Sequence, residues 1–330
     1  MISDTNILNR HVFFLPVNTG FVTHGEPDSR FIEFYDERSS PELYCSIVGN
    51  VVVPDGFGSN TSTPMISTSP IWSRIAKSIK AGGSKPGMQL ATTWEGYTGI
   101  KNFLSNDPQV FIPEARQLVG RLNADSIANV LTSFELATCM AIDHGFEHIQ
   151  IHAAHGYLLS LLVDGRINRQ AASVLDRLSL LADRISSRGA ESSIRISLRT
   201  GDQEFDSTDI DAFHNSIVQL PFDFVDLSSG FYNIDKRLIY PSTPPFIDAR
   251  LEESMDLGIR HPDRAFIISG RISTKNWSNM PLNLHPGLCR DLIANPKFLS
   301  DLENGCRNHS KCHYYSRGTH FLTCGRWNAK

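Results

Sequence analysis

The segment that most constrains the fold is residues 146–160, which read FEHIQIHAAHGYLLS. Apolar and polar residues alternate over 148–152, the two-residue period typical of a β-strand, and Gly145 ends a helix-like run just before it. Gly156 then allows a turn that most residues resist. The segment therefore predicts a strand that ends in clustered His and Tyr side chains. In an α/β barrel, catalytic residues gather at such strand ends.

Three interpretations of this segment compete. His144, His148 and His152 recur every four residues, which on a single helix would place three zinc ligands on one face. Gly145 and the alternation after it argue against a continuous helix. The plainest alternative is a strand end with structural, hydrogen-bonded histidines. The rest of the chain favours the catalytic interpretation.

Composition narrows the class of protein. The chain has 330 residues, 41% apolar and 20% charged, and a net charge of −4, so no basic field attracts nucleic acid or an anionic membrane. No apolar run approaches the roughly 20 residues of a membrane helix, and the start MISDTNILNR does not resemble a signal peptide. We therefore expect a cytoplasmic protein. Its six cysteines would be free, metal-bound or catalytic.

Strand-like runs alternate with helical patterns along the chain, which predicts a parallel α/β architecture. Strands are expected at 11–17, 45–53, 88–91, 148–152, 193–198, 224–227 and 265–269, with a poorly marked eighth near 282–285. Helices are expected at 70–81, 126–144, 172–187, 209–219 and 248–256. The pattern predicts a (β/α)8 TIM barrel over 1–300 and a short tail over 301–330 in the same domain. A doubly wound sheet is the alternative, but no G-x-G-x-x-G turn follows the first strand.

The run IHAAHGYLLS, followed by Asn168 and Arg169, resembles the signature of the old yellow enzyme family of FMN-dependent NAD(P)H oxidoreductases. Further fragments resemble the family in the same order: NRHVFFLPVNTG (9–20), FYDERSS (34–40), SIVGNVVV (46–53), GMQLA (87–91), IRIS (194–197), DFVDLSSG (223–230), IISGRIS (267–273) and CRDLIANP (289–296). The resemblance implies an eight-fold β/α barrel that binds FMN and takes electrons from NAD(P)H.

The resemblance also implies which residues hold FMN. The ring would contact Pro16, Val17, Asn18, Gly49, Asn50, Gln89 and Arg195, and the phosphate would contact Gly270, Arg271, Cys289 and Arg290. Gln89 can donate and accept hydrogen bonds, which suits the N3–H and carbonyl edge of the ring. A fixed cation at Arg195 would stabilise anionic reduced flavin. Barrels commonly bind phosphate after their seventh and eighth strands.

The family mechanism assigns three catalytic residues to this chain. His152 and His155 would donate to the oxygen of a carbonyl conjugated to an alkene, and Tyr157 would protonate the α-carbon. A phenol with a pKa near ~10 is protonated at neutral pH and can therefore act as an acid. Two alternatives are a flavin-dependent isomerase without net redox chemistry and a metal-tail scaffold that has lost flavin.

The chain departs from the family pattern at three places. NRQAASVLDR replaces the usual Asn-Arg-Asp-x-Tyr-Gly-Gly run, and Cys289 stands where a glycine usually precedes the last phosphate arginine. The stretch from 270 to 290 is also a few residues short. These departures concern phosphate geometry and substrate access more than the fold.

The tail carries the spacing C-x2-H-x2-C-x11-C, formed by Cys306, His309, Cys312 and Cys324. It resembles the four-cysteine 4Fe–4S motif of the family's 2,4-dienoyl-CoA reductase and trimethylamine dehydrogenase-like branch, with a histidine in place of one cysteine. A 4Fe–4S cluster, a zinc ion and a metal-free tail remain open. We expect the chain to lack that branch's C-terminal FAD and NAD domains. A cluster would therefore imply a separate reductase or ferredoxin as the electron donor.

Overall fold

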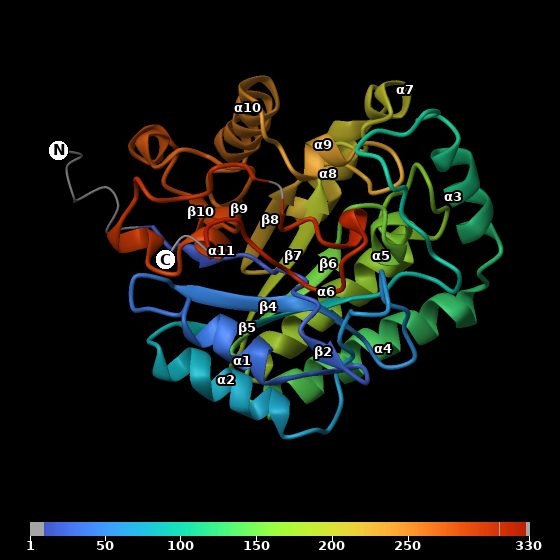
Figure 1. Cartoon of the computed structure of the whole chain (residues 1–330). Coiled ribbons are helices and arrows are strands. Elements are labelled where there is room, and N and C mark those ends of the chain that lie inside the picture. The colour runs from blue at the N-terminus through green and yellow to red at the C-terminus, as the bar shows by residue number, and fades with distance from the viewer. Residues whose placement is uncertain (1–9, 310, 328–330) are drawn as a thin grey trace.

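The computed structural model describes residues 10–309 and 311–327. Eight parallel strands close into a barrel in the order β1-β10-β9-β8-β7-β6-β5-β4 (Figure 1). The strands are β1 Phe13–Phe14, β4 Cys45–Val52, β5 Lys85–Ala91, β6 His148–Ala153, β7 Glu191–Ser197, β8 Phe224–Ser228, β9 Ala265–Ile268 and β10 Leu284–Leu288. A hairpin of β2 Val22–Thr23 and β3 Glu26–Pro27 lies outside the barrel sheet. The predicted (β/α)8 barrel is confirmed.

Helices surround the barrel (Figure 1). They are α1 Ser29–Asp36, α2 Ile71–Ala81, α3 Phe111–Gly120, α4 Ala124–Asp143, α5 Leu158–Leu162, α6 Ala171–Ser187, α7 Gln203–Asp206, α8 Ile210–Val218, α9 Lys236–Ile239, α10 Pro244–Arg260 and α11 Arg290–Ala294. All five predicted helices form, but α10 is longer than the expected 248–256: it begins four residues earlier and ends four residues later. The helix can begin earlier because its first turn contains prolines, and a missing N–H in the first turn breaks no helical hydrogen bond. None of the helices in the described ranges is long and apolar enough to span a membrane.

Strand alternation sorts the barrel residues into two sets. Ile149 and Ile151 of β6 belong to the large apolar cluster that includes residues of the surrounding helices. Gln150 pairs in register with Gln89 of β5 on one side and Ser193 of β7 on the other. Because side chains alternate across a strand, the polar residues share the opposite face from the isoleucines, inside the barrel. The single-helix zinc interpretation is wrong, because His144 caps α4 while His148 and His152 lie on β6.

The eighth strand lies slightly later than predicted. β10 runs over Leu284–Leu288 and pairs with both β9 and β1, which closes the barrel. Its sequence contains Pro286 and Gly287, two residues that strands usually avoid, and they hide the strand signal. Gly287 is needed because a Cβ there would lie 2.8 Å from the side chain of Leu15 on the loop after β1.

The tail returns to the carboxyl end of the barrel. The Leu322 N–H donates to the Thr19 carbonyl oxygen at 2.7 Å, and the Trp327 indole N–H donates to the Ile293 carbonyl oxygen at 2.7 Å. These bonds hold two parts of the tail against the loop after β1 and against α11. Tail residues can therefore reach the same space as the strand ends.

Candidate active site

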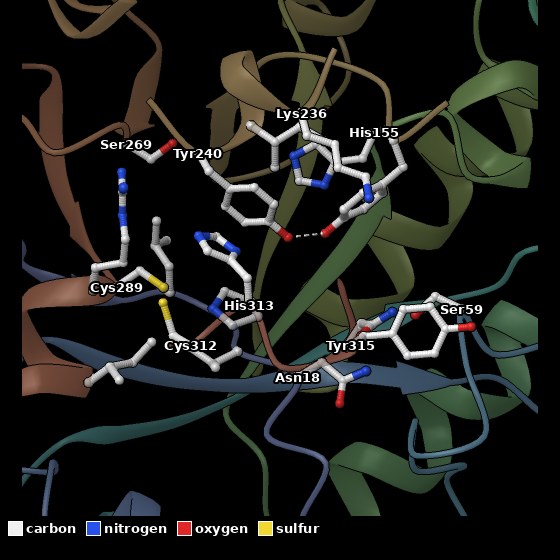
Figure 2. A pocket seen from close by; sticks show the side chains of 18 of the residues that line it. Asn18, Ser59, His155, Lys236, Tyr240, Ser269, Cys289, Cys312, His313 and Tyr315 are labelled. Carbon is white, nitrogen blue, oxygen red and sulfur yellow. Dashed lines mark hydrogen bonds between the residues drawn. The ribbon is translucent and has the colours of Figure 1, made fainter. Parts of the chain in front are cut away.

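A cavity of about 260 Å³ opens at the carboxyl ends of the strands. Figure 2 shows side chains from several strands, loops and the tail pointing into it. The predicted cofactor and catalytic residues that line it are Pro16, Val17, Asn18, Asn50, Gln89, His152, His155, Tyr157, Arg195, Gly270, Arg271, Cys289 and Arg290. Gly49 is not in the wall. A Cβ at this position would lie 2.9 Å from that of Gln89, so only glycine fits beside the glutamine.

A buried chain of hydrogen bonds orients the polar floor of the cavity. The Gln89 amide donates to Gln150 Oε1 at 2.6 Å, and the Gln150 amide donates to Asp226 Oδ2 at 3.0 Å. Arg195 donates to the same carboxylate oxygen at 2.5 Å and to Ser228 Oγ at 3.2 Å. These bonds leave the Gln89 carbonyl oxygen to accept from an N–H in the cavity. They also hold the Arg195 guanidinium in place.

Asp226 and Gln150 were not identified as site residues from the sequence, although their positions in the strands could have indicated it. Both lie on the same strand face as residues that were predicted: Gln150 pairs with Gln89, and Asp226 pairs with Arg195. Burial raises the pKa of Asp226, while the Arg195 cation and its hydrogen bond act in the opposite direction. Asp226 is fully buried beside Arg195, so its role is to hold the Arg195 guanidinium in position.

Cations dominate the wall around β7, β9 and β10. Arg250 is not itself a lining residue, but burial and the nearby Arg195 cation lower its pKa to about 9. Burial also lowers the pKa of Arg290, and the neighbouring Arg271 cation adds to this effect. Arg271 and Arg290 use some of their donors on the carbonyl oxygens of Cys306 at 3.2 Å and Pro241 at 2.6 Å. Neighbouring arginine cations favour an anionic ligand between them and the cavity, so Arg271 and Arg290 fit the phosphate of FMN.

The two histidines are neutral donors. Burial and the nearby Arg195 cation lower the pKa of His152 to about 3, and burial with the neighbouring His152 and Arg195 lowers that of His155 well below 6.5. The Ala154 N–H donates to His152 Nδ1 at 3.1 Å, so the ring proton of neutral His152 lies on Nε2. His155 Nε2 is 2.7 Å from Ser228 Oγ. The two rings are 5.1 Å apart and nearly perpendicular, at 82°.

Tyr157 is packed between two rings at the start of α5. Its ring stacks on His152 at 4.9 Å and on Tyr232 at 5.5 Å between centroids. Only 4% of the residue is exposed. Burial raises the pKa of its phenol well above 10, and the nearby Tyr232 adds to the shift. The hydroxyl is therefore protonated throughout the neutral range.

The cover of the cavity comes from residues that the sequence did not single out. They are Tyr97, Tyr232, Lys236, Tyr240, His313, Tyr314 and Tyr315. The Tyr232 and Tyr240 hydroxyls are 2.7 Å apart, as the dashed line in Figure 2 marks. The Tyr240 ring lies 4.4 Å from that of His313 in the tail. The tail thus forms part of the wall, a contribution that no motif in the sequence indicated.

The predicted metal ligands do not form a metal site. They are Cys306, His309, Cys312 and Cys324. Within 10–309 and 311–327, no group of three or more His, Cys, Asp or Glu residues is arranged to hold a metal ion. The His309 ring lies against Gly325, where a Cβ would be 3.2 Å from its carbons. Cys312 lines the cavity and points toward Cys289 in Figure 2. The predicted 4Fe–4S or zinc site is therefore not supported by the described part of the chain.

Together, the closed barrel and this cavity define a TIM-barrel protein with an enzyme-type site at the carboxyl ends of its strands. Residues 2–173, just over half of the chain, match the family described as NADH:flavin oxidoreductase / NADH oxidase. The chain belongs to this family. The predicted membership of the old yellow enzyme family is confirmed, and this membership supports the predicted class of FMN-dependent oxidoreductase. Family membership supports FMN as the cofactor and NAD(P)H as the electron donor.

Similar proteins include oxidoreductases from bacteria and a fungus. A metal reductase of Desulforamulus reducens is 22% identical over 321 residues, which cover 90% of this chain and 47% of the relative. The NADH-dependent flavin oxidoreductase iliE of Hypocrea jecorina is 24% identical over 306 residues, which cover 81% of this chain and 73% of the relative. An NADPH dehydrogenase of Bacillus subtilis is 26% identical over 201 residues, which cover 56% of this chain and 57% of the relative. The chain thus spans about half the length of the metal reductase, and the match to the NADPH dehydrogenase covers little more than half of either protein.

Proposed function

We propose that the chain is an FMN-dependent ene-reductase that reduces an alkene conjugated to a carbonyl, with NAD(P)H as the electron donor. The observation that carries this proposal is the convergence of two neutral imidazoles and one protonated phenol in a single cavity. All three side chains are buried, and all three line the same wall. Neutral N–H donors and a nearby acid are the groups that polarised alkene reduction needs from the protein.

The cavity residues suit FMN at both of its ends. Gln89 and Arg195, fixed by the Asp226 network, would hold the polar edge of the ring, and Arg271 and Arg290 would hold the phosphate. The loop after β1, with Pro16 to Asn18, would line the ring. When bound, FMN supplies a hydride to an electron-poor carbon.

The protein's own groups would prepare the substrate and complete the reaction. His152 would donate its Nε2–H to the substrate carbonyl oxygen, and His155, held at Ser228, would provide the second donor. These two hydrogen bonds withdraw electron density from the alkene and make its β-carbon electrophilic. Tyr157 would give its hydroxyl proton to the α-carbon. General acid help of this kind contributes on the order of 10²–10⁴ in rate.

The test uses freshly purified protein. We expect FMN to be released on denaturation, and we expect NAD(P)H oxidation under anaerobic conditions to depend on cyclohexenone and to yield cyclohexanone. Absence of bound FMN would favour a scaffold without flavin chemistry. If the position of a double bond changes without any added reductant, the site is an isomerase. If FMN is present and no enone is reduced, the proposed activity is wrong.

A further inference from the structure

One buried cation of the cavity has no role in the chemistry described above. Lys236 begins α9 on the loop after β8, and only 6% of the residue is exposed. Its Nζ donates to the carbonyl oxygen of Ile100, which also lines the cavity. Within the described residues, no carboxylate lies at ion-pair distance from Lys236. The adjacent Asp235 instead pairs with Arg237 at 2.7 Å.

Such a lysine is unusual, because buried charges are normally paired. Burial lowers the pKa of Lys236, and no acidic neighbour opposes this effect. Nearby, burial together with the Arg290 and Lys236 cations lowers the pKa of His313 to about 4. The charged side chains that act on His313 beside Lys236 are therefore cations. A carbonyl dipole alone compensates the ammonium group only in part, so an anion in the cavity would complete its environment.

The other cations of the wall already have partners or roles. Arg195 is paired with Asp226, and Arg271 and Arg290 lie where the FMN phosphate is proposed. In Figure 2, Lys236 lies on the same side of the cavity as His155, away from Ser269 and Cys289. Ser269 and Cys289 follow β9 and β10, the strands beside the phosphate arginines. Lys236 is thus placed on the substrate side of the cavity.

We propose that Lys236 binds a carboxylate of the substrate, so that the preferred substrates are enones that also carry an acidic group. This inference rests on the proposed function, because the imidazole pair must hold the carbonyl while the lysine holds the carboxylate. Lys236 would then determine specificity and take no part in the hydride or proton transfer. An ammonium–carboxylate pair that is shielded from water discriminates strongly against a neutral analogue.

The test compares enone acids of increasing chain length, beginning with trans-acetylacrylate, with their methyl esters. The quantity measured is the ratio of kcat/KM for the acid to kcat/KM for the ester in each variant. We expect wild type to prefer an acid, and Lys236→Gln, which keeps an N–H donor for Ile100, to lower the ratio at least about tenfold. Lys236→Arg keeps the charge and should retain most of the preference. Lys77→Gln makes the same change in charge on the exposed face of α2 and is the matched control.

Because both substrates are measured with each variant, a loss of folded protein cancels in the ratio. A ratio that stays within about twofold in Lys236→Gln, or a wild-type preference for every ester, would overturn the inference while leaving the proposed function intact. An unchanged ratio with a raised KM for NADPH would also overturn it, by assigning the lysine to the electron donor. If FMN is bound and neither acid nor ester is reduced, the proposed function fails and this inference fails with it.

Discussion

Replacing Tyr157 by phenylalanine is expected to slow the reduction of an enone by a factor on the order of 10²–10⁴, the usual contribution of a general acid. The substitution removes one hydroxyl and keeps the ring that stacks on His152 and Tyr232. Substrate binding by the histidine pair should persist, so the loss should appear in kcat. Because burial raises the pKa of the Tyr157 phenol, its ionisation should not lower the rate below pH ~10.

The two half-reactions can be measured separately by rapid mixing. Reduction of bound flavin by NAD(P)H needs no acid from Tyr157 and should change by less than about threefold, whereas reoxidation by the enone should slow. Tyr232→Phe is the matched control, because it removes a hydroxyl from the adjacent ring of the same stack. We expect it to slow reoxidation by less than about tenfold. Unchanged reoxidation in Tyr157→Phe would remove this residue as the proton donor.

The barrel could be predicted because short strand-like runs alternate with longer helical patterns along the chain. Apolar and polar residues alternate clearly over 148–152, and the structure has the expected strand there, β6. Strand ends in a parallel barrel meet at one rim, so a motif at one strand end located the cavity. The eighth strand was harder to place, because Pro286 and Gly287 oppose the usual strand composition.

Other parts of the site could not be read from local patterns. The spacing of Cys306, His309, Cys312 and Cys324 resembles a ligand set, but spacing does not determine where an irregular tail directs each side chain. Lys236 lies on a helix of four residues, and its burial depends on contacts with Ile100, far away in the sequence. A lysine in such a segment looks like a surface residue. Long-range packing therefore decides both cases, and a single sequence does not display it.

The largest expected effect on stability lies at the opposite end of the barrel. Glu191, the first residue of β7, accepts hydrogen bonds from the Tyr44 hydroxyl at 2.5 Å and Lys85 Nζ at 3.1 Å, and its other oxygen lies 2.7 Å from His148 Nδ1. Glu191→Ala would remove an acceptor that Tyr44, Lys85 and His148 share in a largely buried cluster, and Lys85 Nζ would keep only its bond to the Tyr44 hydroxyl at 2.7 Å. We expect the free energy of unfolding, measured by urea denaturation, to fall by about 3 kcal/mol.

Glu147→Ala is the matched control for this loss, because Glu147 pairs with Lys80 at 2.5 Å while their side chains are 40% and 67% exposed. Such a surface pair should contribute less than about 1 kcal/mol. Burial acts to raise the pKa of Glu191, but the hydrogen bond and charge of His148, with Tyr44 and Lys85, outweigh it and lower the pKa from 4.5 to about 2. Because the folded-state pKa is the lower one, this stabilisation is present above pH 4.5 and is lost as the pH falls toward 2. The difference in unfolding free energy between wild type and Glu191→Ala should therefore shrink over that range. A difference equal to that of Glu147→Ala, or one independent of pH, would show that the cluster does not stabilise the barrel.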